Sequence, residues 1–247
     1  MPARLVETLA CGIDAPHAAD VALLPTIDYQ SLQGLRIIPV GGIGCDGPTL
    51  TVRLFAHVPV ERVAIVACDV ESHTSVALAR VLCAKLWKTS PRFVPMAEAS
   101  GDDDEARLLI GDKVICEPPL AFPIQLDLGE AWKQLTGLPF VFAIWTARPD
   151  LDLGELPAKL ERAKQLGLSR AADLVSRYAV PRGWPADVAL AYVTQYLRYD
   201  IGPPQIEAIN RFHAYALELN LLPTDRQPLR VVTPSDAEQA HGHPEGA

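Results

Sequence analysis

Two long apolar segments, residues 51–58 and 140–147, enclose a block in which shorter apolar segments alternate with helical patterns. Apolar segments of this length predict strands, and strands that alternate with helices indicate an α/β protein. Long strands at both ends of an internal block are typical of a two-lobed fold, in which two crossing strands form a hinge. We therefore expect lobe one at 1–57 and 146–232, lobe two at 58–145, and a disordered tail at 233–247.

Composition excludes several classes of protein. The chain has 49% hydrophobic residues and a formal net charge of −8, which argues against nucleic-acid or anionic-membrane binding. No segment approaches the roughly 20 apolar residues needed to span a bilayer, and from the first residues we expect no signal peptide. The five cysteines are scattered without a CxxC pair, so we expect free thiols in a reducing cytoplasm and no metal site.

Shorter patterns predict the elements that position a site. Residues 35–40 read as a buried strand that ends at Gly41-Gly42, and residues 62–68 read as another strand. Hydroxyl residues at 72–75 then open a helix, where an N-cap belongs. The last third of the chain is helical, and Pro203-Pro204 suits a first helical turn.

Several segments, taken in order, carry a resemblance to a known family. They are Gly44–Val52, Ser72–Leu78, Leu109–Asp112 and the long run DLGEAWKQLTGLPFVFAIW at Asp127–Trp145. Together they resemble the chorismate dehydratase family of menaquinone biosynthesis, from about Pro2 to about Leu219. The long run is specific by itself, whereas the other segments gain weight from their order.

The resemblance implies a fold and a reaction. The fold is expected to be two-lobed and similar to type II periplasmic binding proteins. The reaction is expected to be loss of water from chorismate, which gives 3-[(1-carboxyvinyl)oxy]benzoate in the futalosine pathway. The resemblance implies a cytoplasmic lyase without a cofactor or metal, whose partner is the small-molecule substrate, and it leaves the oligomeric state open.

One group of expected substrate-binding residues lies at a helix start. Ser72, His73, Thr74 and Ser75 can offer hydroxyls and backbone N–H groups to a substrate carboxylate, because a helix N-terminus favours anions. In the family an arginine is common where this chain has His73. A plain N-cap is the alternative interpretation. Gly111, in the third matched segment, is also expected to bind substrate.

A second group lies near the expected hinge strands. The family pattern places a catalytic serine at Thr51, and threonine keeps the hydroxyl while stiffening χ1. Arg53 shares Thr51's face of a strand and is a candidate cation for a carboxylate. Thr136 and Gly137 are expected at a turn that faces the cleft. Simple strand propensity, a solvent-facing arginine and a structural glycine turn are the corresponding alternatives.

The matched segments contain no obvious general base. Asp46 and Asp112 read first as turn residues. We therefore expect the substrate's own side-chain carboxylate to take part in proton removal.

The resemblance also implies a departure at the front of the chain. In the family, a strand with a catalytic asparagine, a helix and a second strand precede the segment that matches Pro2–Leu5. We therefore expect lobe one to lack its first strand–helix unit and to show an unpaired strand edge. Alternative functions are a related 1,4-dihydroxy-6-naphthoate synthase, a non-catalytic carboxylate-binding module, or an inactive paralogue.

Overall fold

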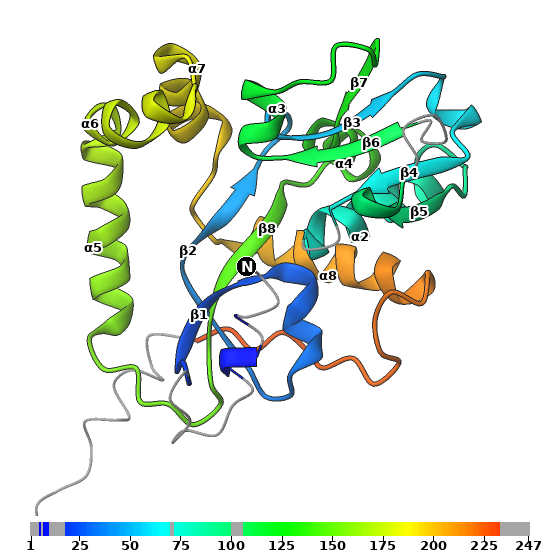
Figure 1. Cartoon of the computed structure of the whole chain (residues 1–247). Helices are drawn as coiled ribbons and strands as arrows, with labels where there is room; N and C mark the ends of the chain where they lie inside the picture. Colours follow the sequence, from blue (N-terminus) through cyan, green and yellow to red (C-terminus); the bar gives the residue numbers. More distant parts are fainter. Residues whose placement is uncertain (1–4, 6, 10–17, 70–71, 100–105, 233–247) are drawn as a thin grey trace, which may run out of the picture.

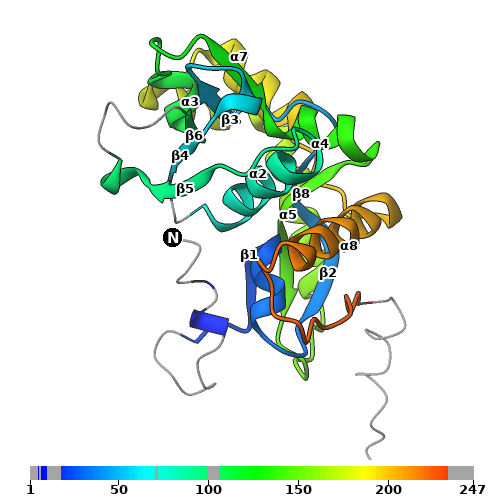
Figure 2. The ribbon, with the colours of Figure 1, turned by 90° about the vertical axis from the view of Figure 1, so that its right-hand side faces the viewer.

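The computed structural model describes residues 5, 7–9, 18–69, 72–99 and 106–232, so the expected tail at 233–247 lies outside the described residues. Two sheets form the frame of the molecule (Figures 1 and 2). The three-stranded sheet has the order β1 (Val21–Pro25), β8 (Phe140–Ala147), β2 (Arg36–Cys45). The five-stranded sheet has the order β5 (Arg92–Pro95), β4 (Ile65–Cys68), β6 (Ala106–Ile110), β3 (Val52–Ala56), β7 (Ile124–Asp127).

Helices pack on both sheets and connect them. The α-helices are α2 (His73–Lys85), α3 (Asp112–Cys116), α4 (Leu128–Thr136), α5 (Leu156–Ser169), α6 (Ala171–Leu174), α7 (Ala186–Ala191) and α8 (Pro203–Glu218). Short 3₁₀ turns are η1 (Thr26–Ser31), η2 (Val60–Arg62), η3 (Met96–Glu98) and η5 (Val180–Arg182), and π turns are η4 (Val175–Ala179) and η6 (Tyr192–Tyr196). Residues 156–199, from α5 to just beyond η6, form the arm; in Figure 1 its helices α5, α6 and α7 lie at one side and rise from the three-stranded sheet towards α3.

The crossing strands are β2 and β8, and our assignment of residues 51–58 to the hinge is wrong. β8 pairs antiparallel with β1 and β2, whereas β3 pairs with β6 and β7 inside the five-stranded sheet. β3 reads as a long apolar segment because neighbours flank it on both sides, not because it joins the lobes. Residues 52–56 therefore belong to the sheet of the second lobe, although we expected them in the first.

β2 continues through the glycines that we expected to end it. A Cβ at Gly42 would lie 2.7 Å from the Ala143 carbonyl oxygen, and one at Gly44 would lie 2.6 Å from the Phe140 carbonyl oxygen. The glycines therefore allow close approach to β8 where the pairing shifts register. Glycine here marks contact between backbones and not a turn.

The core that joins the two lobes is aromatic. Trp132 on α4 is fully buried, and its indole Nε1 donates to the Pro139 carbonyl oxygen at 2.9 Å. Its ring meets Phe140 of β8 edge-on at 5.2 Å and Phe212 of α8 at 6.1 Å. Burial of three large rings from three elements stabilises the junction between the sheets.

β1 lies at one edge of the three-stranded sheet. Its strand partner is β8, and no other described strand pairs with it. Because every open sheet has two edge strands, this edge does not test the unpaired strand edge that we expected in lobe one. The loss of a first strand–helix unit itself stays a prediction.

A buried polar network fastens the C-terminal segment to η1. His213 on α8 is fully buried, with Nε2 2.8 Å from the Thr26 carbonyl oxygen and Nδ1 3.1 Å from Gln30 Nε2. Gln227 N donates to Gln30 Oε1 at 3.0 Å. Burial lowers the pKa of His213 from 6.5 to about 4, so the imidazole is neutral at pH 7.

We expect His213 to make the free energy of unfolding fall as the pH drops from 6.5 towards 4. In that window the unfolded chain binds a proton at this histidine and the folded chain does not, so acid favours unfolding. The loss reaches about 3 kcal/mol at 1.36 kcal/mol per pKa unit. His213→Gln should be less stable at pH 7 but lose less stability in acid. Urea unfolding at several pH values measures this, with exposed His57→Gln as control; equal pH slopes in wild type and His213→Gln would contradict it.

Candidate active site

Three segments meet at one edge of the five-stranded sheet. β4 and β6 are parallel, and β3 runs antiparallel to β6, so the ends of β4 and β6 lie beside the start of β3. Gly111, after β6, donates its N–H to the Thr51 carbonyl oxygen at 2.9 Å. Ser72, after β4, is the N-cap of α2. The edge therefore gathers Thr51, Gly111 and the start of α2, three of the segments that the sequence singled out.

Asp127 fixes the segment that leads to Thr51. Its carboxylate accepts from the backbone N–H groups of Thr49 at 2.9 Å and of Leu50 at 2.8 Å. It also accepts from Gly129 and Glu130, which makes it the N-cap of α4. Leu50 has φ 68°, a left-handed conformation that costs a non-glycine residue about 1–2 kcal/mol. One carboxylate therefore holds a strained turn and starts a helix.

The start of α2 faces lobe one. Ser72, Thr74 and Ser75 are each less than 10% exposed, and the helix begins at His73 as predicted. The Thr74 hydroxyl accepts from Ile27 N of η1 at 3.4 Å. The Ser72 side chain makes no capping hydrogen bond within the described residues, so it leaves the N–H groups of the first turn to other acceptors.

His73 bridges the lobes through a carboxylate. Its Nδ1 lies 2.8 Å from Asp28 Oδ2 of η1. Burial raises the pKa of Asp28, and the hydrogen bond and charge of His73 oppose this shift. The side chain that stands at the family's arginine position is thus engaged with a carboxylate of this chain.

Tyr192 of the arm reaches the same edge, a contact that the sequence did not predict. Thr51 Oγ1 donates to Tyr192 Oη at 3.0 Å. Burial raises the pKa of Tyr192, partly offset by the hydrogen bond from Thr51. The two residues are far apart in sequence, and the tyrosines at 192, 196 and 199 read only as one face of a helix, so no local signal indicated the pair.

Backbone and side-chain hydrogen bonds anchor the arm on both sides of Tyr192. Arg198 exchanges backbone hydrogen bonds with Gly44, at 2.8 and 2.9 Å, and Gly42 N donates to the Tyr199 carbonyl oxygen at 2.9 Å. On the other side, Trp184 Nε1 donates to Asp112 Oδ1 at 2.7 Å. These contacts hold Tyr192 between the edge of β2 and the start of α3.

Arg53 has two polar side-chain neighbours within the described residues. Its Nη1 donates to Gln125 Oε1 at 2.9 Å, and its Nε lies 4.0 Å from Asp127 Oδ2. Both partners lie on β7. Arg53 thus lies near the Asp127 carboxylate, although its Nε makes no hydrogen bond within the described residues.

Thr136 and Gly137 end α4 and do not join the edge in any described contact. The Thr136 hydroxyl donates to the Trp132 carbonyl oxygen at 2.9 Å and accepts from Leu138 N at 3.1 Å. Gly137 has φ 73° and caps the helix. The helix rises about 13 Å over its nine residues, and its other end is the one beside Thr49. These contacts match the structural-turn alternative.

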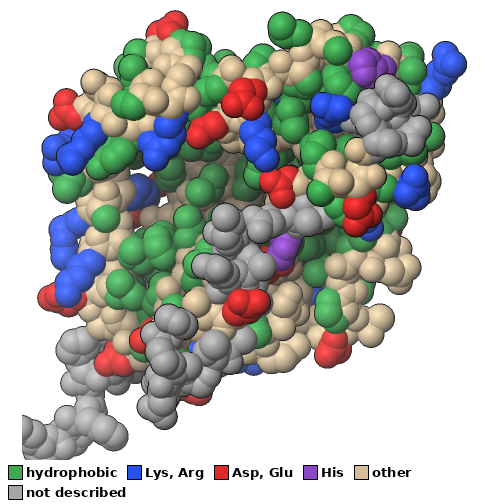
Figure 3. Space-filling model, viewed as in Figure 1, with side chains coloured by type: hydrophobic (Ala, Val, Ile, Leu, Met, Phe, Trp, Pro, Cys, Tyr) green, Lys and Arg blue, Asp and Glu red, His purple; other side chains and the backbone are tan. Residues whose placement is uncertain are grey.

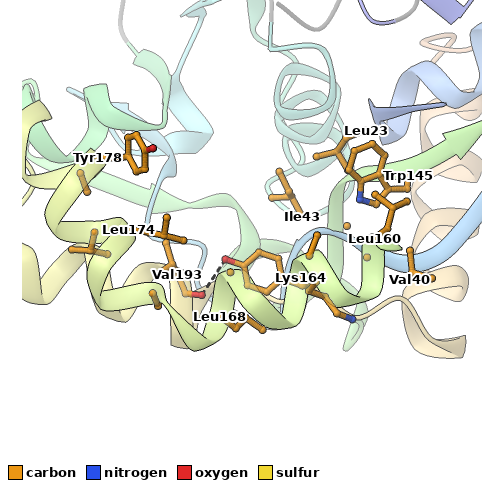
Figure 4. A pocket seen from close by; sticks show the side chains of 18 residues that line it. Leu23, Val40, Ile43, Trp145, Leu160, Lys164, Leu168, Leu174, Tyr178 and Val193 are labelled. Carbon is orange, nitrogen blue, oxygen red and sulfur yellow. Dashed lines mark hydrogen bonds between the residues drawn. The ribbon is translucent and has the colours of Figure 1, made fainter. Parts of the chain in front are cut away.

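A large apolar pocket lies between the arm and the three-stranded sheet. It has a volume of about 570 Å³, and Figure 3 shows the hollow with hydrophobic side chains. In Figure 4, Trp145 and Leu23 of the sheet lie at one end, and Leu174 and Tyr178 of the arm lie at the other. The dashed line is the hydrogen bond from Tyr199 Oη to the Val193 carbonyl oxygen, 3.0 Å long.

The structure also bears on the cysteines, on metal binding and on membrane-spanning helices. Cys45, Cys68 and Cys83 are buried free thiols, as expected, and burial raises the pKa of Cys45 and Cys83 to about 12. Within the described residues, no group of three or more His, Cys, Asp and Glu side chains could hold a metal ion. No helix in the described part of the chain is both long and apolar enough to cross a membrane.

The two sheets, the crossing strands and the helical arm define a two-lobed, periplasmic-binding-protein-like fold, and solved structures agree. Protein AF1704 from Archaeoglobus fulgidus matches with a TM-score of 0.61 at 18% identity, over 82% of this chain and 80% of that one. The alkanesulfonate-binding protein SsuA from Xanthomonas axonopodis pv. citri, bound to MOPS, matches with a TM-score of 0.59 at 15% identity, over 90% and 81%. At these identities the matches establish the fold alone.

Sequence comparison then gives the family. A sequence model of the menaquinone biosynthesis family matches residues 6–218, and the chain belongs to that family. It is also similar to the chorismate dehydratase of Thermus thermophilus, at 29% identity over 90% of this chain and 87% of that protein.

We expect Asp127→Asn to lower the free energy of unfolding by about 2 kcal/mol, because the variant loses charged hydrogen bonds to the backbone of a strained turn. Denaturant unfolding measures the change. The matched control is Asp46→Asn, which removes an exposed carboxylate paired with Lys133 at 2.6 Å. Such surface pairs are worth about 0–1 kcal/mol, so equal effects of the two substitutions would refute the role of Asp127.

Proposed function

We propose that this chain is a chorismate dehydratase, a cytoplasmic lyase of the futalosine route to menaquinone that forms 3-[(1-carboxyvinyl)oxy]benzoate. The observation that carries the proposal is the convergence of Thr51, Gly111 and the start of α2 at one edge, in a chain of the menaquinone biosynthesis family. The similarity to the Thermus thermophilus enzyme supports the same reaction.

The substrate carboxylates would bind through neutral donors. The first-turn N–H groups of α2, with the hydroxyls of Ser72 and Ser75, suit an anion because the helix dipole adds to their hydrogen bonds. Thr74 and His73 contact lobe one, so in this proposal they close the lobes around the substrate. Arg53, Thr136 and Gly137 would contribute by supporting the local structure.

The reaction removes the proton on C3 and the hydroxyl on C4 of chorismate, which leave together as water while the ring becomes aromatic. No side chain in the matched segments is an evident base. The substrate's own side-chain carboxylate would take the C3 proton and then give it to the departing C4 hydroxyl, so that water leaves and the carboxylate is restored. The site would supply orientation and hydrogen bonds. This division needs no organic cofactor or metal.

Incubation of the purified chain with chorismate tests the proposal. We expect chorismate to be replaced by an aromatic product whose mass is lower by one water, as followed by liquid chromatography and mass spectrometry. Heat-denatured chain controls for the spontaneous breakdown of chorismate. Binding of chorismate without turnover would instead favour a carboxylate-binding module, and neither binding nor turnover would favour an inactive paralogue.

We expect Ser75→Asp to raise KM for chorismate at least about tenfold, because a second negative charge beside a carboxylate costs more than about 1.4 kcal/mol in a confined site. Steady-state kinetics measure the change. Ser90→Asp, an exposed position beyond the other end of α2, adds the same charge as a control. Equal KM values for the two variants would exclude the helix start as the anion site.

A further inference from the structure

Of the two hydrogen-bonded side chains Thr51 and Tyr192, the tyrosine is the more exposed to solvent. Thr51 is only 3% exposed, whereas Tyr192 is half-buried. Their hydroxyl oxygens are 3.0 Å apart. A molecule that approaches Thr51 from the arm side therefore meets the tyrosine hydroxyl, and the threonine lies behind it.

The number of hydroxyl protons in this pair also favours Tyr192 as the residue that meets an approaching molecule. Each hydroxyl has one proton, and their mutual hydrogen bond uses one of the two. Thr51 is buried, and its hydroxyl donates to Tyr192. Tyr192 therefore keeps its own O–H for a third group. Because burial raises its pKa, the phenol stays protonated at neutral pH and can donate.

The surroundings of Tyr192 limit how its ring can move. The ring lies 5.3 Å from the Trp184 ring, and Trp184 is held by its hydrogen bond to Asp112. Tyr192 is also the first residue of the π turn η6, and such turns are frequent at functional sites. The backbone bonds from Arg198 to Gly44 fix the residues that follow.

We propose that Tyr192 contacts the substrate and donates a hydrogen bond to the oxygen that leaves C4, and that Thr51 is the positioning residue that orients the tyrosine. This inference rests on the proposed dehydratase function. The family resemblance gave the catalytic role to Thr51, whereas this inference assigns contact with the substrate to Tyr192. A hydrogen bond to the departing oxygen stabilises the charge that develops as the C4–O bond breaks.

The test compares kcat and KM for chorismate in wild type, Tyr192→Phe, Thr51→Val, Thr51→Ser and the double variant Thr51→Val/Tyr192→Phe. Tyr192→Phe keeps the ring against Trp184 and removes only the hydroxyl, so kcat should fall about 100-fold. Thr51→Val should lower kcat less, by about tenfold, and Thr51→Ser should restore most of it. The double variant should be no worse than Tyr192→Phe, because without the phenol Thr51 has nothing to orient.

Tyr199→Phe is the matched control. Its hydroxyl belongs to the same arm and donates to the Val193 backbone carbonyl oxygen, not to Thr51. Its kcat should stay within about threefold of wild type, a margin well below the loss expected when a hydrogen-bond donor to the developing charge is removed. Thermal unfolding checks that every variant folds.

The outcomes separate the two proposals. A wild-type chain that turns over chorismate while Tyr192→Phe keeps full kcat overturns the role of Tyr192 alone. A greater loss in Thr51→Val than in Tyr192→Phe also overturns it and returns the contact to Thr51. A folded wild-type chain that does not dehydrate chorismate overturns the proposed function, and this inference with it.

Discussion

The geometry of the site depends on the carboxylate of Asp127. It accepts hydrogen bonds from four backbone N–H groups, two in the turn before β3 and two in the first turn of α4. Those bonds offset the cost of the left-handed Leu50 and set the direction in which the chain enters β3. Thr51 follows directly and accepts from Gly111, so the position of the whole edge follows from one partly buried acceptor.

A second constraint is the close approach that glycines permit along β2. Gly42 and Gly44 lie against β8 on one side. On the other side their backbone groups form hydrogen bonds with the backbone of Arg198 and Tyr199 in the arm. A side chain at either position would clash with a β8 carbonyl oxygen within 2.7 Å. The glycines therefore bring the two lobes' crossing strands and the arm together, and the arm brings Tyr192 to the edge of the other sheet.

Sequence patterns predicted the elements whose signals are local. The start of α2, the prolines that open α8 and the strand β8 agree with the expectation, because capping residues and apolar runs act over a few residues. The hinge partner of β8 was missed, since Gly41-Gly42 reads as a turn until β8 is known to pack against it. The Tyr192 contact was missed because the arm makes it across 141 positions.

The candidate cation Arg53 and the histidine at the family's arginine position both lie near carboxylates of the chain itself. His73 lies against Asp28, and Arg53 lies near Asp127. Under the proposed function, a substrate dianion would therefore be held mainly by neutral donors, namely helix N–H groups and hydroxyls. Such donors are effective only where water is excluded, because solvent screens them and competes for the same acceptors. The contacts of η1 with the start of α2 join the lobes at this point. Under the proposed function, lobe closure would therefore be part of recognition, because the groups that join the lobes would also exclude the water that competes with neutral donors for an anion.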